Sequence, residues 1–179
     1  MTEPKIKVIL ACDGFGEDLK NTLVQHLQSN DIPTKDLGCD TYYDASAKVA
    51  KEILLSKEEE AETKNVGVLV CGTGMGVGMI ANKFPGIRAA TCENMAAVRC
   101  ARAVNDANVL CLGQLVTSAE DGKVMMDEFL KHEFIARPNL GDGGDTPAPW
   151  WNENVEDFLK GSMEGIQRVE KDALNYASG

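Results

Sequence analysis

The chain has 179 residues, which is enough for one sizeable domain and short for two. Hydrophobic residues make up 44% of it and charged residues 26%, as in ordinary soluble globular proteins. A formal net charge of −10 without a basic cluster argues against a nucleic-acid partner, because nucleic acids are bound by concentrated positive charge. The apolar stretch in MTEPKIKVILA is far shorter than the ~18 residues that cross a bilayer, so no membrane partner is expected.

Strands and helices are predicted to alternate along most of the chain. In order, they are a strand at 5–13, a helix at 16–30, a strand at 31–38, a helix at 44–62, a strand at 65–71, a short helix at 79–84, a strand at 87–92, a helix at 94–105, a strand at 108–114 and a helix at 118–132. The first helix carries an apolar stripe at Leu19, Leu23 and Leu27. Ser118, followed by acidic residues, is typical of the start of the last one.

The run NVGVLVC at 65–71 is apolar almost throughout, which is typical of a strand buried on both faces of a parallel sheet. Strands that alternate with helices are joined by right-handed crossovers. The predicted fold class is therefore α/β. We expect a doubly wound, three-layer α/β/α sandwich of the Rossmann type with a five-stranded parallel sheet.

The end of the chain departs from this alternation. Residues 137–151 are rich in glycine, proline and aspartate and are expected to form a loop. Residues 152–179 return to a helical period, and such a tail can pack on its own core or on a partner subunit. We expect one domain at 1–136, then the loop, then a C-terminal helical extension of the same domain.

The six cysteines include no CxxC pair and there are only two histidines, so neither a metal site nor a cofactor is expected. Several of the cysteines lie in apolar runs, where a free thiol behaves as a small hydrophobic group. Free thiols fit a reduced, cytoplasmic setting best.

Residues 70–78, VCGTGMGVG, form a glycine-rich run at the end of the third predicted strand. Ligands of open α/β sheets bind beyond the carboxyl ends of the strands, and glycines let backbone N–H groups approach an anion. The spacing fits neither the dinucleotide-binding pattern GxGxxG nor the P-loop pattern. We interpret the run as a cradle for a phosphate or a developing oxyanion. A tight turn that binds nothing is the alternative.

Cys71 is the residue of this run that is best suited to take part in a reaction. A thiol just ahead of a helix N-terminus can ionise more readily than a free one, and a thiolate can act as nucleophile or general base. Thr73 offers a hydroxyl to a neighbouring oxygen. The alternative interpretation of Cys71 is packing, because free cysteine is among the most buried residue types.

The segments CGTGMGVGMIANKFPGIRAATC and NDANVLCLG resemble the ribose-5-phosphate isomerase B family and its galactose-6-phosphate isomerase relatives. ACDGFGEDLK matches the start of that family, a strand followed by a Cys-Asp pair. The resemblance runs from about residue 6 to residue 135. A narrower resemblance, in YY, ANKFPG, AATC and APW, is to the isomerase-like domain of plant DNA-damage-repair/toleration proteins.

The resemblance implies an aldose–ketose isomerase that acts on a sugar phosphate through an enediolate. It implies that Cys71 is the base that moves a proton between C1 and C2, and that Thr73 stabilises the enediolate oxygens. The residues implied to bind the substrate are Asp13, Gly72, Gly74, Gly76, Asn105 and Arg168. It also implies a homodimer with sites at the interface, across which Arg168 would hold the phosphate.

The chain departs from the family pattern at four single positions and in the segment DTYYD at 40–44, which stands where the family has Asp-Tyr-Pro. Gly14 and Val104 stand where the family has histidines, of which the second opens the sugar ring, and Leu115 and Glu164 stand where it has phosphate-binding arginines. We therefore expect a substrate that is already open-chain, such as a tetrose phosphate, or one whose ring opens without enzymatic help. A catalytically silent module that binds sugars or sugar phosphates is the alternative hypothesis. A redox-sensing thiol protein is a third, which rests on the six cysteines alone.

Overall fold

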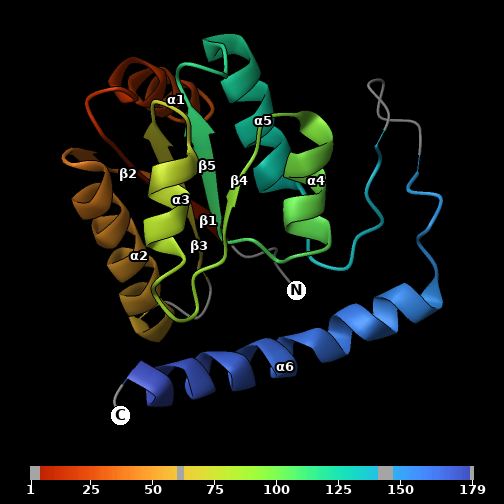
Figure 1. Cartoon of the computed structure of the whole chain (residues 1–179). Helices are drawn as coiled ribbons and strands as arrows, with labels where there is room; N and C mark the ends of the chain where they lie inside the picture. Colours follow the sequence, from red (N-terminus) through yellow and green to blue (C-terminus); the bar gives the residue numbers. More distant parts are fainter. Residues whose placement is uncertain (1–4, 60–62, 141–146, 178–179) are drawn as a thin grey trace.

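The computed structural model describes residues 5–59, 63–140 and 147–177 and shows one parallel sheet with helices on both faces (Figure 1). The strands are β1 (Lys5–Cys12), β2 (Thr34–Cys39), β3 (Thr63–Cys71), β4 (Ala89–Thr91) and β5 (Val109–Gly113). The helices are α1 (Glu17–Ser29), α2 (Tyr42–Glu59), α3 (Met75–Ala81), α4 (Met95–Ala103), α5 (Ala119–Lys131) and α6 (Glu153–Ala177). The five strands lie in the order β2-β1-β3-β5-β4 and every pair is parallel, so the predicted α/β fold is confirmed.

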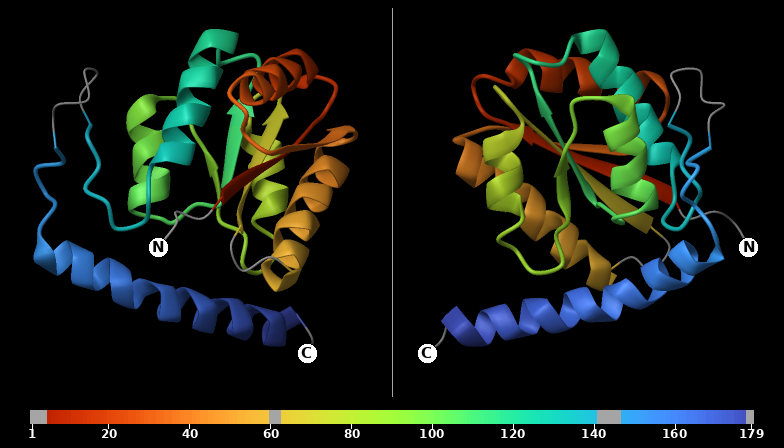
Figure 2. Two further views of the ribbon diagram at one scale, coloured as in Figure 1. Left: turned by 180° about the vertical axis from the view of Figure 1, so that it is seen from behind. Right: turned by 45° about the vertical axis from the view of Figure 1, so that its right-hand side comes forward.

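Two hydrophobic cores lie on the two faces of the sheet (Figure 2). Helices α1, α4 and α5 cover one face, and α2 and α3 cover the other. Strand β3 is buried between them: Val68 and Val70 point into the first core, and Leu69 and Cys71 point into the second. Alternate residues of a strand point to opposite faces, and both faces of β3 are covered. Burial on both faces explains why residues 65–71 are apolar almost throughout.

Two predicted elements differ clearly from the structure in their bounds. Helix α3 spans Met75–Ala81 and begins inside the glycine run, instead of spanning residues 79–84. Close packing favours glycine at two positions of this helix: a Cβ would lie 3.2 Å from Tyr42 Cδ2 at Gly76 and 2.8 Å from Thr91 Oγ1 at Gly78. Strand β4 has three residues instead of the six predicted at 87–92, and it pairs with β5 alone at the edge of the sheet.

Helix α6 runs across the end of the sheet opposite the strand arrowheads (Figure 1). Leu159 near its start packs with Trp151, and Glu170 further along accepts a 2.9 Å hydrogen bond from the N–H of Gly86. Four of its large apolar side chains stay exposed, namely Phe158, Ile166, Val169 and Leu174. Neither this helix nor any other in the described ranges is both long and apolar enough to span a membrane.

The segment predicted as a loop at 137–151 is irregular where it is described, with one isolated bridge between Asn139 and Pro147. Residues 141–146 of the predicted loop lie outside the described residues. The division into a domain at 1–136 and an extension at 152–179 stays a prediction.

Gly113, at the end of β5, tests how tightly the turn after β3 is packed. A Cβ at this position would lie 2.4 Å from the carbonyl carbon of Thr73, which is a clash with backbone. We expect Gly113→Ala to lower the free energy of unfolding by about 1–3 kcal/mol, the usual cost of overpacking. Urea denaturation followed by circular dichroism measures this change.

Gly161 on α6 provides the matched control, because a Cβ there would meet nothing within 4 Å. Alanine is favoured over glycine inside a helix by up to about 1 kcal/mol, so Gly161→Ala should be neutral or stabilising. Equal stability of the two variants would contradict the packing at Gly113.

Candidate active site

The carboxyl ends of β1 and β3 lie side by side, and the N–H of Asp13 donates to the carbonyl of Val70 at 3.1 Å. The chain leaves β1 towards α1 on one face and leaves β3 towards α3 on the other. Chains that diverge in this way open a crevice, which is where doubly wound folds bind ligands. A pocket of about 720 Å³ occupies this place. Its lining residues are Asp13, Phe15, Tyr42, Cys71, Gly72, Thr73, Gly76, Met79, Ile80, Lys83 and Leu115.

Cys71 ends β3 at the floor of this pocket and is only 5% exposed. Its Sγ accepts a hydrogen bond from the N–H of Gly74 at 3.1 Å, and its carbonyl accepts one from the N–H of Gln114 at 2.9 Å. Both the thiol and its backbone are therefore fixed in position. Cys71 packs in the core beneath α2 and α3, as the packing interpretation expected, and it also lines the pocket.

The turn that follows Cys71 depends on a left-handed glycine. Gly74 has φ of +78°, a conformation that side chains disfavour, and a Cβ there would lie 2.9 Å from the backbone of Leu112. The hydroxyl of Thr91 donates to the carbonyl of Gly74 at 3.0 Å. The hydroxyl oxygen of Thr73 accepts a long hydrogen bond, 3.4 Å, from the N–H of Met75. The first part of the glycine-rich run is therefore a turn that hydrogen bonds hold in place, and it leads into α3.

Burial affects the pKa of four other cysteines. Burial raises the pKa of Cys12 to about 12, with a further contribution from Cys39 beside it, and burial raises the pKa of Cys92 to about 11. Burial also raises the pKa of Cys100 and of the fully enclosed Cys111. These four thiols stay protonated at neutral pH. Cys12, Cys92 and Cys111 belong to the two cores, as the packing interpretation expects of cysteines in apolar runs.

Asp13 follows β1 and supplies the only carboxylate among the described residues that line the pocket. Its Oδ1 accepts the N–H of Phe15 at 2.9 Å, and its carbonyl accepts the N–H of Gly16 at 3.0 Å. Gly16 lets this turn pass close to β3, because a Cβ there would lie 2.6 Å from the backbone of Val70. The structure therefore brings Asp13, Cys71 and Thr73 to one pocket.

Several lining residues were not found as site residues from the sequence. They are Phe15, Tyr42, Met79, Ile80, Lys83 and Leu115, of which Leu115 was noted only as a departure. Tyr42 begins α2 and its ring lies against Gly76. Lys83 stands inside the quoted segment ANKFPG, and Phe15 stands two residues after Asp13. These positions were available in the sequence, but periodicity does not show which exposed residues meet across a crevice.

The structure does not bring Asn105 and Arg168 to this pocket. Asn105 follows α4 and lines a separate hollow of about 550 Å³, to which α6 contributes Ile166. Arg168 lies on α6 with a side chain that is 73% exposed, 3.7 Å from Asp172. Within one chain, both residues belong to a different region from the turn at 71–74.

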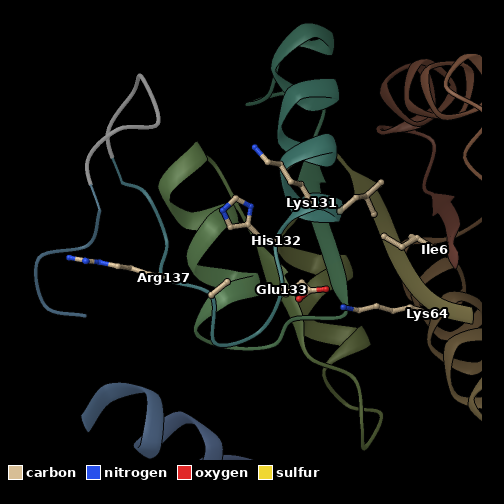
Figure 3. Close-up of a pocket in the computed structure, with 8 residues that line it drawn as sticks. Ile6, Lys64, Lys131, His132, Glu133 and Arg137 are labelled. Carbon is tan, nitrogen blue, oxygen red and sulfur yellow. The ribbon is translucent and has the colours of Figure 1, made fainter. Parts of the chain in front are cut away.

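A further hollow of about 620 Å³ lies beside the end of α5 and carries several basic side chains (Figure 3). They do not converge: Lys131 and Arg137 point away in different directions, and Lys64 points towards the carboxylate of Glu133. Burial lowers the pKa of Lys64, with an additional contribution from the charge of Arg102. This arrangement offers no common point for one anion. Among the described residues, no group of three or more His, Cys, Asp or Glu side chains is placed to hold a metal ion.

The fold and the crevice together define a Rossmann-like α/β protein with a small-molecule pocket at its topological switch point. The model of the Ribose/Galactose Isomerase family matches residues 8–139, and the chain belongs to this family. The family resemblance of the glycine run and of the segment at 105–113 is therefore confirmed.

The names of the chain's relatives refer to different functions. DNA damage-repair/toleration protein DRT102 of Arabidopsis thaliana is 34% identical over 166 residues, which cover 93% of this chain and 51% of that protein, so the chain spans about half of this relative. The 4-deoxy-4-sulfo-D-erythrose isomerase of Clostridium sp. (strain MSTE9) is 30% identical over 172 residues, covering 93% and 96%. The crystal structure of ribose-5-phosphate isomerase B from Mycoplasma genitalium with bound ribulose-5-phosphate aligns with a TM-score of 0.73 and 28% identity, covering 94% and 98%.

Substitution of Thr91, which lies in β4, tests whether a residue outside the turn at 71–74 stabilises that turn. Thr91→Val removes the hydroxyl that bonds to the carbonyl of Gly74 and keeps the shape of the side chain. The loss of one such hydrogen bond costs about 1 kcal/mol, so we expect hydrogen exchange at the Gly74 amide to become several-fold faster. Exchange measured by NMR gives the rate. Thr22→Val is the control, since Thr22 makes the same kind of bond within α1, to the carbonyl of Asp18. An unchanged rate in Thr91→Val would show that the turn does not depend on Thr91.

Proposed function

We propose that the protein is an aldose–ketose isomerase that acts on an open-chain sugar phosphate or a close analogue, with Cys71 as the base. The supporting observation is the position of the Cys71 thiol. Its Sγ is fixed by the N–H of Gly74 at the floor of a pocket that also contains Asp13 and Thr73. Family membership supports the reaction class.

The proposed reaction moves two protons and changes no oxidation state overall. Cys71, as thiolate, takes the proton from C2 of the aldose, and the electron pair of that bond moves towards O1, so that an enediolate forms. The proton of O2 passes to O1, and the thiol returns its proton to C1 as the C2 carbonyl forms. Charge develops on O1 and O2 between these steps, so fixed donors beside them lower the barrier.

The donors for this charge are the Thr73 hydroxyl and amides of the glycine turn. The N–H of Gly74 is already directed at Cys71 Sγ, which removes it from the predicted set of Gly72, Gly74 and Gly76. Gly76 lies in the first turn of α3, where backbone N–H groups have no partner within the helix. We propose that Thr73, Gly72 and Gly76 stabilise the enediolate and that Asp13 binds a substrate hydroxyl.

An open-chain substrate fits the residue at position 104, where the family has its ring-opening histidine. Val104 is partly buried against the cluster of Ala148, Trp151 and Leu159, and its side chain exchanges no proton. Ring opening by an acid or base at that position is therefore absent from the proposal. Relatives named for a four-carbon sulfo-sugar and for a five-carbon phosphate support a short chain of four or five carbons.

A sugar-binding module without catalysis is the second candidate. The observation in its favour concerns Gly14, the residue after Asp13. Gly14 has no side chain, and no neighbouring atom lies within 4 Å of where its Cβ would be, so this position supplies no chemical group to a substrate. Thermal-shift screening with phosphorylated and neutral sugars detects binding, and NMR detects proton exchange. A sugar that binds without exchange of its protons supports the module.

The proposed base is tested with Cys71→Ser and Cys71→Ala. We expect exchange of the C2 deuterium of labelled ribose 5-phosphate and tetrose phosphates to fall by about 10²–10⁴-fold, the usual contribution of a positioned general base. NMR measures the exchange. Cys39→Ser is the control, since Cys39 is exposed and lies outside the pocket lining, and it should keep full exchange. Wild-type exchange in both Cys71 variants would eliminate Cys71 as base, and no exchange in the wild-type protein would eliminate the isomerase.

We further propose a homodimer in which Asn105 and Arg168 serve the site of the other subunit. Both lie away from the pocket of their own chain, on a side where α6 leaves Phe158, Val169 and Leu174 exposed. An exposed apolar helix surface of this kind favours burial against another protein, and a second copy is the commonest partner. In this arrangement Arg168 faces the anionic end of the substrate.

Subunit complementation tests this arrangement. Cys71→Ala and Arg168→Ala should each be inactive alone, because each dimer lacks one component of both sites. After mixing and subunit exchange, half of the dimers carry one intact site, and activity should recover to about a quarter of the wild-type value. Analytical ultracentrifugation checks that dimers form. If mixed dimers form without recovery, Arg168 does not act across the interface.

A further inference from the structure

Two free cysteines stand opposite each other on neighbouring strands. Cys12 ends β1 and Cys39 ends β2, and the two residues are in register. Neighbouring strands lie about 4.8 Å apart, within the range of roughly 4.4–6.8 Å that separates the Cα atoms of a disulfide. The thiols also interact: burial raises the pKa of Cys12, and the charge of Cys39 and a hydrogen bond with its thiol raise it further.

An irregularity of β2 produces this pairing. Leu10 is in register with Asp36, so a regular ladder would place Gly38 opposite Cys12 and would turn Cys39 to the other face of the sheet. One extra residue in β2 shifts the register between these pairs, as in a β-bulge. Gly38 has φ of +82°, which glycine adopts without strain. The bulge therefore brings the side chain of Cys39 to the face on which Cys12 lies.

The two thiols differ in their access to solvent. Cys12 is fully buried, and its Sγ donates a weak hydrogen bond to the carbonyl of Gly38 at 3.9 Å. Cys39 is exposed. An oxidant in solution therefore reaches Cys39 first, with a second thiol already beside it. An accessible cysteine next to a resolving cysteine is the usual arrangement of redox-sensing sites.

We propose that Cys12 and Cys39 form a redox-sensitive pair, which a hydroperoxide converts into a reversible disulfide. The sulfur of Cys39 attacks the terminal oxygen of the hydroperoxide, the O–O bond breaks, and the thiol proton leaves with the alcohol or water. The sulfur of Cys12 then attacks the sulfenic sulfur of Cys39, the S–O bond breaks, and the Cys12 proton leaves with the hydroxide as water. The two electrons that the thiols lose reduce the O–O bond, and an external dithiol reverses the reaction by exchange.

The pair lies directly before two residues of the pocket. Cys12 immediately precedes Asp13, and Cys39 comes three residues before Tyr42; Asp13 and Tyr42 both line the pocket. The N–H of Asp40 donates to the carbonyl of Cys12 at 3.0 Å, so the two strand ends are already linked through their backbones. A covalent bond draws two sulfurs closer than any non-bonded contact, and both strand ends must adjust. Oxidation therefore displaces Asp13 and lowers the activity of the pocket.

Peptide mapping tests the disulfide without any need for turnover. The reduced protein is treated with one equivalent of hydrogen peroxide, its remaining thiols are alkylated, and the digest is analysed by mass spectrometry. We expect a peptide that joins Cys12 to Cys39 and disappears after treatment with dithiothreitol. Cys100→Ser is the matched control, because it removes a thiol of intermediate exposure outside this pair, and it should keep the cross-link. Oxidation that leaves Cys12 and Cys39 unlinked, or that joins other cysteines instead, overturns the proposal.

NMR tests the effect on the pocket. We expect the amide resonance of Asp13 to shift on oxidation of the wild-type protein, to return with dithiothreitol, and to stay unchanged in Cys39→Ser treated in the same way. An unchanged resonance in the oxidised wild-type protein would overturn the link to the pocket.

Activity separates this pair from direct oxidation of Cys71. Exchange of the C2 deuterium should fall by about 10- to 100-fold in the oxidised wild-type protein, the usual cost of a small displacement at a reacting site, and should persist in Cys39→Ser. An equal loss in both proteins would place the oxidation at Cys71 and overturn the link to the pocket. If the reduced wild-type protein exchanges no deuterium, the proposed isomerase fails, whereas the cross-link and the Asp13 resonance still decide on the pair.

Discussion

The pairing of β1 with β3 is the constraint on which the rest of the site depends. It places the end of each strand beside the other, with the N–H of Asp13 bonded to the carbonyl of Val70. Because the following helices cover opposite faces, the two chain segments separate at this point and leave room for a ligand. The carboxylate of Asp13 and the thiol of Cys71 therefore come from residues 58 positions apart in sequence and share one pocket.

Glycine has several distinct functions around this pairing, and only some concern a ligand. Gly74 supplies a left-handed backbone, and Gly113 allows the turn to touch β5. Gly78 makes room for Thr91, which holds the turn through the carbonyl of Gly74. A glycine-rich run after a strand can thus result from backbone packing as much as from anion binding. The same packing makes the turn rigid, which suits the oxyanion stabilisation that we propose for it.

The chain presents its chemical groups at two separate ends. Cys71 and Thr73 lie at and after the carboxyl end of β3, whereas Asn105 lines a hollow to which α6 contributes Ile166, and Arg168 lies on α6 itself. In the homodimer that we propose, the pocket of one chain faces the α6 region of its partner. The exposed apolar side chains of α6 are consistent with such a contact.

The sequence by itself determined the alternation of strands and helices, the buried third strand and the family, because these depend on periodicity and on contiguous motifs. It also singled out Cys71 and Thr73, which lie in the glycine run at the end of the third strand, and Asp13 through the resemblance to the family. Only the tertiary structure decided that α3 begins inside the glycine run and that Phe15, Lys83 and Leu115 meet at one pocket. Those facts depend on contacts between distant segments, and no local pattern encodes which exposed side chains face each other across a crevice.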